Sequence, residues 1–394
     1  MIKLEATYLK SLAIMMAWLL LGCIEPFETE FVDFKDAFVV DAKITDEMKR
    51  QEIVLTRTYR FQDEGPPPEA NASIMVKDNS GNEYAFEETD SGKYLSKIPF
   101  AASPQKEYHL SITTQNGKKY RSQDMSLPQE SKIDTVYAKR LTNDLGEEGM
   151  AIFVSAALTD DANSFYRYEY EETYKVIAPR WAPRELEVIR GGIGDSIILV
   201  PRSLDERICY PSRVSNKILL ADTEDFTGGT VSDFMVHFIN RNDYIISHRY
   251  SILVRQHTHS IETASFLETL NNFSTNESLF SETQPGFLEG NIYSEQDANE
   301  RILGYFDVSA VDEKRIFFNY VDFFPGERLP PYVEPCVENA PAIGLVDLIR
   351  SNLVKYVREN DGEFNPGGPH VTVPAVCGDC TILGTSEVPD FWIE

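Results

Sequence analysis

The sequence lacks the short motifs by which the commonest catalytic sites are recognised. It contains no GxSxG, HExxH, GxxxxGKS/T or GxGxxG segment, the patterns of a serine nucleophile, a zinc protease site, a phosphate loop and a dinucleotide fold. The nearest glycine cluster, Gly191-Gly192-Ile193-Gly194, is followed by no clear helix start, so we expect a hairpin or bulge there. We therefore expect a protein that is not an enzyme, with no catalytic residue and no cofactor.

Basic side chains are also scarce. The 37 Lys and Arg residues stand against 63 Asp and Glu residues, which gives a net charge of -26. A surface this negative repels phosphate backbones, so we expect no nucleic-acid partner. The composition does not indicate disorder, because 42% of the 394 residues are hydrophobic and can bury a large core. A chain of this length favours two domains.

The first apolar run, residues 12–21, is too short to cross a bilayer as a helix, which takes about 20 residues. Lys3 and Lys10 precede the run and Gly22-Cys23 follows it, the order found in a bacterial lipoprotein signal peptide. We expect residues 1–22 to be removed and Cys23 to carry diacylglycerol and palmitate, which anchor the protein in outer-membrane lipid. The alternative is a buried N-terminal strand or helix with an incidental cysteine.

An acidic segment follows the lipidation site. Residues 23–36 resemble the signal that exports Bacteroidota lipoproteins to the cell surface, although the match is not to its tightest form. We expect this segment to act as a tether, with the folded part of the protein facing the cell exterior. Its acidic residues are Glu25, Glu28, Glu30 and Asp33.

Four further cysteines are an even number in a chain that has left the reducing cytoplasm, so disulfides are the first expectation. Cys377-Gly-Asp-Cys380 also has the spacing of half a zinc site or of a redox pair, and these two alternatives stay open. Four cysteines allow three pairings, and the sequence does not choose among them. The disulfide candidates are Cys209, Cys336, Cys377 and Cys380.

The segment 37–130 consists of short alternating runs separated by turn residues, which predicts an immunoglobulin-like or transthyretin-like β-sandwich. Gly and Asn residues at 78–82 and 114–118 supply the positive φ angles of tight hairpins. We place the domain boundary near residue 130, because Leu127-Pro128-Gln129-Glu130 ends the alternation. Seven strands are expected, at residues 38–40, 53–55, 72–76, 84–86, 94–95, 108–112 and 119–120.

Residues 131–394 are predicted to form a larger β-rich domain with two or so short helices. The runs 250–254 and 302–308 are continuously apolar, which is typical of central strands. At 165–171 tyrosines alternate with charged residues, which predicts one packed and one solvated face. The packed face would hold Tyr166, Tyr168 and Tyr170, and the solvated face Arg167, Glu169 and Glu171.

Apolar residues spaced by three and four predict the two helices. One would start after Ser260 and present Phe266, Leu267, Leu270 and Phe273 as a stripe. The other would run over residues 343–357. We interpret both apolar stripes as core contacts. The buried side of the second would hold Val346, Ile349, Leu353 and Tyr356.

Three features are weak candidates for ligand binding. His257 and His259 lie on one face of an extended strand and could hold Zn or Cu, with Glu262 as a third ligand, but histidines that are exposed or hydrogen-bonded are the more favoured reading. The acidic loop 222–225 could bind calcium, although it lacks EF-hand spacing. Trp181 lies in a loop-like setting, between prolines, where it could contact a ligand or partner.

Short segments in both parts of the chain resemble a family of Bacteroidota lipoproteins, catalogued as domain of unknown function 4249. The N-terminal segments are Phe38-Val39-Val40-Asp41, Leu55-Thr56-Arg57-Thr58, Gly92-Lys93-Tyr94 and Gly117-Lys118-Lys119-Tyr120-Arg121-Ser122. The C-terminal segments are Gly290-Asn291-Ile292, Leu303-Gly304-Tyr305-Phe306-Asp307-Val308-Ser309, Lys314-Arg315-Ile316-Phe317-Phe318, Cys377-Gly-Asp-Cys380 and Pro389-Asp390-Phe391-Trp392. The resemblance covers nearly all of the chain after Cys23. It implies an outer-membrane lipoprotein, often encoded beside a TonB-dependent transporter, and it implies no catalytic residues.

These observations favour a surface-exposed, non-enzymatic lipoprotein that works with a TonB-dependent transporter or another outer-membrane β-barrel, capturing a ligand or shaping its entry. A structural or adhesive subunit of an outer-membrane assembly is one alternative. An extracellular hydrolase of glycans or peptides is another, because the separation of a catalytic carboxylate pair depends on the fold. A pocket would favour ligand capture over the structural role.

Overall fold

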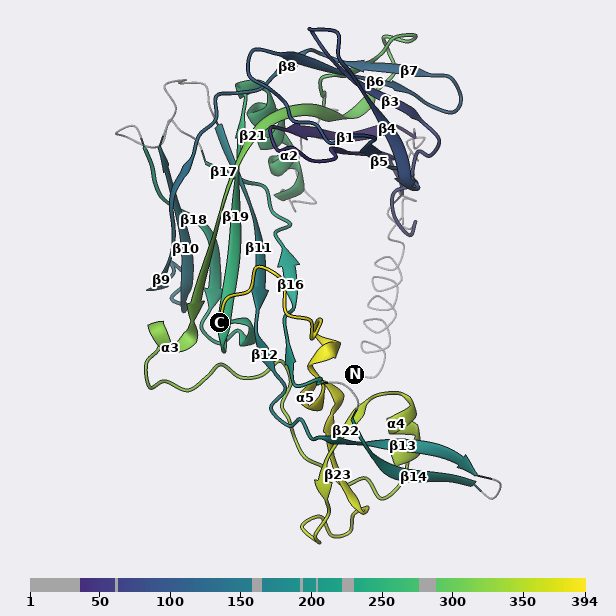
Figure 1. Ribbon diagram of the computed structural model, residues 1–394, viewed down its shortest axis with the longest axis vertical. Helices are drawn as coiled ribbons and strands as arrows, with labels where there is room; N and C mark the ends of the chain where they lie inside the picture. Colours follow the sequence, from purple (N-terminus) through teal and green to yellow (C-terminus); the bar gives the residue numbers. More distant parts are fainter. Residues whose placement is uncertain are drawn as a thin grey trace, which may run out of the picture.

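The computed structural model describes residues 36–60, 63–157, 165–191, 194–202, 205–221, 230–275 and 288–394. The predicted signal peptide and Cys23 lie outside these residues, as does the acidic loop 222–225. The described chain is mainly β with few short helices, as predicted. Figure 1 shows an upper lobe formed by the N-terminal part, a tall middle lobe, and a smaller lower lobe that contains much of the C-terminal part.

The upper lobe contains all seven strands predicted in residues 37–130. Burial alternates along them: in β3, Ile74 and Val76 are buried while Lys77 faces solvent. An eighth, two-residue strand was not predicted. The strands are β1 (Phe38–Thr45), β2 (Glu52–Arg57), β3 (Ser73–Asp78), β4 (Glu83–Asp90), β5 (Lys93–Ser96), β6 (Glu107–Thr113), β7 (Lys119–Ser122) and β8 (Met125–Ser126).

One strand joins the two halves of this lobe. The first half of β4 pairs with β3 and its second half with β5, so the sheet turns at β4 and closes around one core. That core also receives side chains from far along the chain. They are Ile292, Ile302, Phe306 and Val308.

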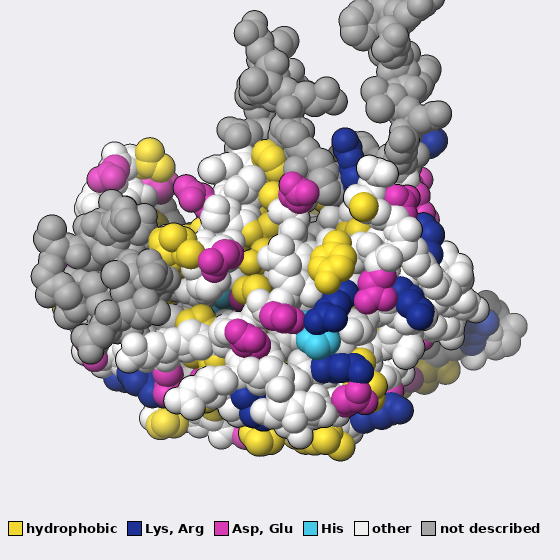
Figure 2. Space-filling view, turned by 90° about the horizontal axis from the view of Figure 1, so that it is seen from above, with side chains coloured by type: hydrophobic (Ala, Val, Ile, Leu, Met, Phe, Trp, Pro, Cys, Tyr) yellow, Lys and Arg dark blue, Asp and Glu magenta, His cyan; other side chains and the backbone are white. Residues whose placement is uncertain are grey.

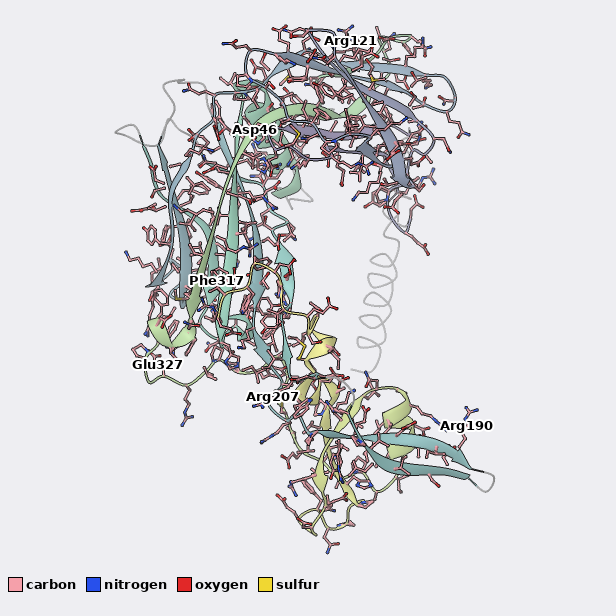
Figure 3. All side chains as sticks on the ribbon, viewed as in Figure 1. Asp46, Arg121, Arg190, Arg207, Phe317 and Glu327 are labelled. Atoms are coloured by element: carbon pink, nitrogen blue, oxygen red, sulfur yellow. A yellow bond between two sulfur atoms is a disulfide. The ribbon has the colours of Figure 1, made fainter. Side chains whose placement is uncertain are left out.

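The long strand β21 (Ile302–Asn319) belongs to both the upper and the middle lobe. Residues up to Ser309 pair parallel with β1, and residues from Ala310 onward pair antiparallel with β19 (Arg249–His259). At this passage, labelled by Asp46 in Figure 3, the Asp46 carboxylate accepts the Val311 N–H at 2.9 Å. β20 (Ile292–Ser294) adds to the edge at β7. A domain boundary near residue 130 stays a prediction. β20 and the first half of β21, which come after that position, pack into the core of the upper lobe.

The middle lobe packs two sheets face to face. The large sheet contributes β11 (Phe165–Tyr174), β19 and β21, with β16 (Ser212–Val214) and β17 (Leu219–Ala221) beside β11. The second sheet holds β9 (Ile133–Thr142), β10 (Glu148–Ala157) and β18 (Thr230–Asn240). Tyr166 and Tyr168 are fully buried between the sheets, as predicted, whereas Tyr170 is half-buried. Both central strands predicted at 250–254 and 302–308 are present.

The lower lobe has a small core, formed by Ala182, Leu186, Leu345 and Tyr356. A hairpin closes between Gly191 and Gly194, as predicted. The elements are β12 (Val176–Ile177), β13 (Arg184–Gly191), β14 (Gly194–Pro201), β15 (Ile208–Cys209), α4 (Leu345–Arg350), β22 (Val354–Glu359), β23 (His370–Pro374), α5 (Ala375–Gly378) and the 3-10 turn η3 (Cys380–Ile382).

The helix predicted over residues 343–357 is wrong in its second half. α4 ends at Arg350, Asn352 has a left-handed φ of 49°, and the chain continues as β22. Asn tolerates this conformation, and the β-branched residues after it favour a strand. The apolar spacing therefore predicted one long helix where the chain forms a short helix, a turn and a strand. Leu353 is consequently exposed, while Tyr356 reaches the core from a strand.

The other predicted helix is present as α2 (Ile261–Thr275), and the Ser260 hydroxyl caps it by accepting the Thr263 N–H at 3.3 Å. Its stripe is not a plain core contact. Leu267 is buried, but Leu270 and Phe273 are 36% and 37% exposed. Two further helical elements of the described residues, η2 (Tyr244–Ile246) and α3 (Tyr320–Phe323), were not predicted.

Candidate functional site

A cavity of about 850 Å³ lies between α2 and one face of the large sheet, where the upper lobe meets the middle lobe. In Figure 1, α2 stands beside β21 at this junction. The volume falls within the range of about 300–1,000 Å³ that is usual for small-molecule sites. The sheet lines the cavity with both charged and apolar side chains, and the side chains that α2 contributes are mainly apolar.

Strand register explains why the charged side chains share a face. Lys43 on β1 is opposite Asp307 on β21, and Arg167 on β11 is opposite His257 on β19. Side chains two residues apart on a strand also share a face. We call the resulting cluster the polar floor. It consists of Lys43, Arg167, Glu169, His257, His259 and Asp307, and all of these except His257 line the cavity.

Glu169 is the centre of one half of the polar floor. Its carboxylate contacts the Arg167 guanidinium, lies 3.7 Å from Lys43 Nζ, and lies 3.2 Å from His257 Nε2. Burial alone would raise the pKa of Glu169, but these three partners outweigh it and hold that pKa below its ordinary value. Burial lowers the pKa of His257 to about 4. Near neutral pH the imidazole of His257 is therefore neutral and Glu169 is ionised.

Asp307 is the centre of the other half of the polar floor and links α2 to the sheet through a hydrogen bond. Its Oδ1 accepts the Thr263 hydroxyl of α2 at 3.0 Å, and His259 Nδ1 lies 3.1 Å from its Oδ2. Burial would raise the pKa of Asp307, but His259, Lys43 and Thr263 outweigh it and lower that pKa to about 2. Asp307 is thus a buried carboxylate that stays charged.

The polar floor is incompletely hydrogen-bonded. Within the part of the chain that the structure describes, neither ring nitrogen of His259 has a hydrogen-bond partner, because the 3.1 Å approach to Asp307 lacks hydrogen-bond geometry. The His259 side chain is 2% exposed. Arg167 Nε is also buried without a partner among those residues. Unmet buried polar groups cost about 1–3 kcal/mol each, so they favour an additional partner in the cavity.

The wall opposite the polar floor is apolar. Phe266 of α2 packs against Tyr305 of β21 with ring centroids 4.8 Å apart. Leu267 and Leu270 extend this wall along the helix. A cavity with a charged floor and an apolar wall is suited to hold a small amphipathic molecule.

The burial of His257 makes stability depend on pH. A histidine in the unfolded chain has a pKa of about 6.5, so between pH 6.5 and 4 the unfolded state binds the extra proton. We expect the free energy of unfolding to fall by about 3 kcal/mol as the pH drops through this window. Glu169 and Asp307, whose pKa values are lowered, add to the loss at lower pH. Urea unfolding at a series of pH values measures the slope.

Two variants test the assignment of this slope. His257→Gln keeps an N–H for Glu169 but does not titrate, so it should flatten the slope. His370→Gln, which removes a histidine that contacts Glu359 at 2.9 Å in the lower lobe, is the comparison variant, and its slope should be steeper than that of His257→Gln. A wild-type slope in His257→Gln would show that His257 is not its source.

The structure places the predicted histidine pair on β19, with ring centroids 5.9 Å apart. Each ring faces a carboxylate, and the predicted third ligand, Glu262, is exposed in the first turn of α2. Among the described residues, no group of three or more His, Cys, Asp or Glu side chains is placed to hold a metal ion. The arrangement therefore favours the interpretation of His257 as a hydrogen-bonded histidine. His259 lies beside a carboxylate, and its ring nitrogens have no hydrogen-bond partner among the described residues.

Trp181 is not among the residues that line the cavity. It is half-buried and packs against the main core of the middle lobe, and its indole N–H is buried without a partner in the described ranges. A ligand contact for Trp181 stays a prediction.

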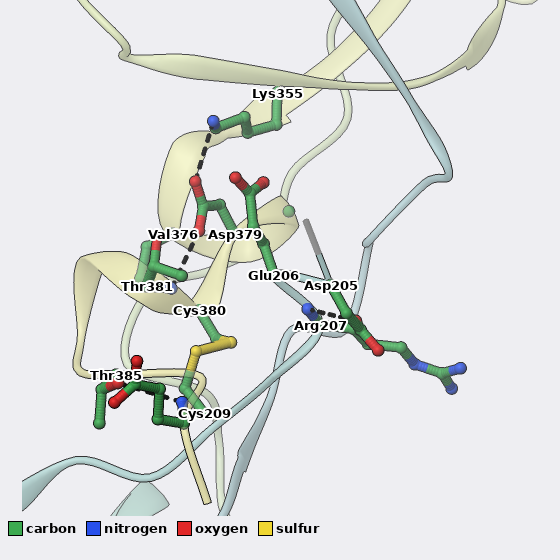
Figure 4. The surroundings of a disulfide bond; sticks show 12 residues. Asp205, Glu206, Arg207, Cys209, Lys355, Val376, Asp379, Cys380, Thr381 and Thr385 are labelled. Atoms are coloured by element: carbon green, nitrogen blue, oxygen red, sulfur yellow. Dashed lines mark hydrogen bonds and ion pairs between the residues drawn. A yellow bond between two sulfur atoms is a disulfide. The ribbon is translucent and has the colours of Figure 1, made fainter. Parts of the chain in front are cut away.

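The four later cysteines form two disulfides, as predicted, and the structure settles their pairing. Cys209 bonds to Cys380 and Cys336 to Cys377. Each cysteine of the CxxC segment thus bonds to a separate partner, unlike a redox pair, which closes on itself. Figure 4 shows Asp379 beside the first disulfide, where it holds Lys355 at 2.9 Å and accepts the Thr381 N–H.

The outer face of the upper lobe differs from the cavity. Figure 2 shows basic and acidic side chains interspersed there around a histidine. On β3 and β6, Lys77 pairs with Glu83, and His109 lies 3.4 Å from Asp124. Exposed pairs such as these contribute little to stability.

Sequence reasoning missed most of the polar floor. Arg167 and Glu169 were expected on a solvated face, but α2 covers that face instead. Lys43 and Asp307 are 264 positions apart and meet through the parallel pairing of β1 with β21. The available signal was the alternation of charges at 167 and 169 opposite the histidines at 257 and 259, which becomes informative once the register is known.

Comparison with known proteins agrees with the resemblance drawn from the sequence. A family model described as "Domain of unknown function (DUF4249)" matches residues 24–315. The matched range holds the upper lobe, the cavity and Cys209, and ends before the other three disulfide cysteines. No curated protein matches the chain. Among the described residues, no helix has both the length and the apolar composition needed to cross a bilayer.

Proposed function

This chain belongs to the DUF4249 family, and from that premise we propose that it is a non-enzymatic, surface-exposed lipoprotein of the outer membrane that captures a ligand for a TonB-dependent transporter. The observation that carries ligand capture is the cavity between α2 and the sheet. It supports this role over a structural or adhesive one, because a purely structural subunit has no need of a cavity lined by unmet polar groups.

The anchor and the partner are supported by the sequence. Acylation of Cys23 would fasten the chain to outer-membrane lipid, and the acidic tether would hold the folded part outside the cell. The upper lobe, with its alternating strands around one core, supports an immunoglobulin-like or transthyretin-like sandwich for residues 37–130. A transporter beside it would receive the ligand that the cavity releases.

The test of this proposal starts from Cys23. In cells fed labelled palmitate, Cys23→Ser should lose the label and leave the membrane fraction, because serine has no sulfur to form the thioether with diacylglycerol. Purification of the wild-type protein in mild detergent should recover an outer-membrane β-barrel protein, and Cys23→Ser should recover far less. The measurements are label incorporation and mass spectrometry of the co-purified proteins.

The matched control is Cys336→Ser with Cys377→Ser, which removes a disulfide from the lower lobe and should keep the label. An unmodified amino terminus on the wild-type protein would contradict the anchor. Repeated purification without any β-barrel protein would contradict the partnership.

A further inference from the structure

The hydrogen-bond inventory of the polar floor shows which groups a ligand would meet. The Glu169 carboxylate already has three partners. Asp307 Oδ1 accepts the Thr263 hydroxyl, whereas Oδ2 has only the 3.1 Å approach of His259, which lacks hydrogen-bond geometry. The cationic side is less satisfied. Lys43 Nζ is 3.7 Å from Glu169, beyond ordinary hydrogen-bond distance, and Arg167 Nε has no partner among the described residues. The polar floor therefore has more incompletely paired donors, on Lys43, Arg167 and His259, than unpaired acceptors, of which Asp307 Oδ2 is one.

His259 adds a buried polar group to the same side. It lines the cavity with a side chain that is 2% exposed, and Nε2 has no hydrogen-bond partner within the described ranges. An imidazole that is protonated donates from Nε2 as well as from Nδ1. A negatively charged group beside the ring would accept a hydrogen bond from a ring N–H.

The apolar residues of the lining would contact the other end of the ligand. Phe266, Leu267 and Leu270 of α2 line the cavity together with Leu303 and Tyr305 of β21. Burying an apolar body here gains roughly 25 cal/mol per Å². The body must be compact, because the whole cavity holds about 850 Å³.

We propose that the cavity under α2 binds a compact organic acid, with its carboxylate at Lys43, Arg167 and His259 and its apolar body against α2. The proposal rests on the proposed ligand capture and names the chemistry of the ligand. A cationic head group would instead compete with Lys43 and Arg167 for carboxylates that they already hold. A neutral head group would leave the donors without a charged partner.

The probe is 2-naphthoate, and its neutral counterpart is 2-naphthamide, which has the same apolar body. Equilibrium dialysis of the full acylated protein, with the same detergent on both sides of the membrane, measures the amount of each probe retained. The wild-type protein should bind naphthoate at least about tenfold more tightly than naphthamide, which is the effect of one hydrogen bond to a charged group.

Three variants locate the binding. Lys43→Met should weaken naphthoate about tenfold and change naphthamide little, because it removes a charge and not the wall. Leu270→Glu, at the exposed edge of α2, should weaken both probes. Lys77→Met is the matched control, since it removes an exposed lysine on the outer face of the upper lobe, and its binding should equal that of the wild type. Thermal unfolding of each variant confirms that it is folded.

Equal retention of naphthoate and naphthamide by the wild-type protein would overturn the proposed acid. So would wild-type naphthoate binding in both Lys43→Met and Leu270→Glu, which would place binding outside this cavity. If neither probe binds while a β-barrel protein still co-purifies with the chain, the organic acid is wrong and the partnership stands. If naphthoate binds as expected but no β-barrel protein co-purifies with the chain, the organic acid stands and the partnership is wrong.

Discussion

Replacing both Cys209 and Cys380 with serine is expected to lower the free energy of unfolding of the protein by about 5 kcal/mol. The bond joins residues 171 positions apart, and in the chain-entropy treatment the stabilisation grows with the logarithm of that separation. Without the bond the unfolded chain regains this freedom. The loss is comparable to the whole stability of many domains, which is about 5–15 kcal/mol.

The lower lobe has little else to replace the disulfide. Its buried apolar core consists of Ala182, Leu186, Leu345 and Tyr356. Small modules with cores of this size commonly depend on disulfides. The Lys355 and Asp379 pair beside the bond is already largely buried, and it would lose its fixed geometry when Cys380 is released. We therefore expect the lower lobe to unfold before the other two.

Tryptophan fluorescence in urea measures this transition, because Trp392 contacts the Tyr210 ring next to Cys209 at 4.9 Å between centroids. The comparison variant is Cys336→Ser with Cys377→Ser, whose bond spans 41 positions and should cost about 4 kcal/mol. Limited proteolysis should cut the lower lobe of both variants sooner than that of the wild type. A wild-type urea midpoint for Cys209→Ser with Cys380→Ser would contradict the expectation.

Local patterns predicted the local structure well. The seven strands of the upper lobe follow from alternation and from Gly and Asn turns, which depend on neighbouring residues alone. The disulfides followed from cysteine parity and compartment, but their pairing depends on which loops meet in space. The apolar spacing at 343–357 fitted a helix and a turn followed by a strand equally well, and Asn352 decided between them.

Long-range pairing could not be predicted in the same way. β21 pairs with β1 in parallel after a separation of more than 250 residues, and nothing in either segment specifies that partner. The site depends on this pairing, because it brings Lys43 beside Asp307. The sequence indicated two of the six polar-floor residues, His257 and His259, and it assigned them to a metal or to ordinary hydrogen bonds. The packing of α2 over that face is a tertiary contact, and no hydrophobic periodicity in the sequence predicts it.

Gly304→Ala is expected to cost more than about 4 kcal/mol, a size that marks a specific structural failure. Gly304 has a φ of +117°, where side chains other than glycine are strained, and a Cβ added there would lie 1.9 Å from the Val40 carbonyl oxygen. That oxygen belongs to β1, directly opposite in the parallel pair. On the other side, Gly290 approaches so closely that its own Cβ would lie 1.7 Å from the Gly304 oxygen. Neither backbone can move without opening the sheet.

Gly194→Ala distinguishes the cost of backbone strain at positive φ from the cost of a steric clash of the added Cβ. Gly194 has a similar φ of +148° but open space around the Cβ position, so its substitution should cost about 1 kcal/mol. Urea midpoints of the two variants measure the difference, and equal midpoints would show that the close approach of β1 and β21 is not essential. The same pair carries Lys43 and Asp307 three residues further along, so a Gly304→Ala protein that still folds should also retain less naphthoate. Loss of stability with full naphthoate binding would mean that the polar floor assembles without the parallel pair.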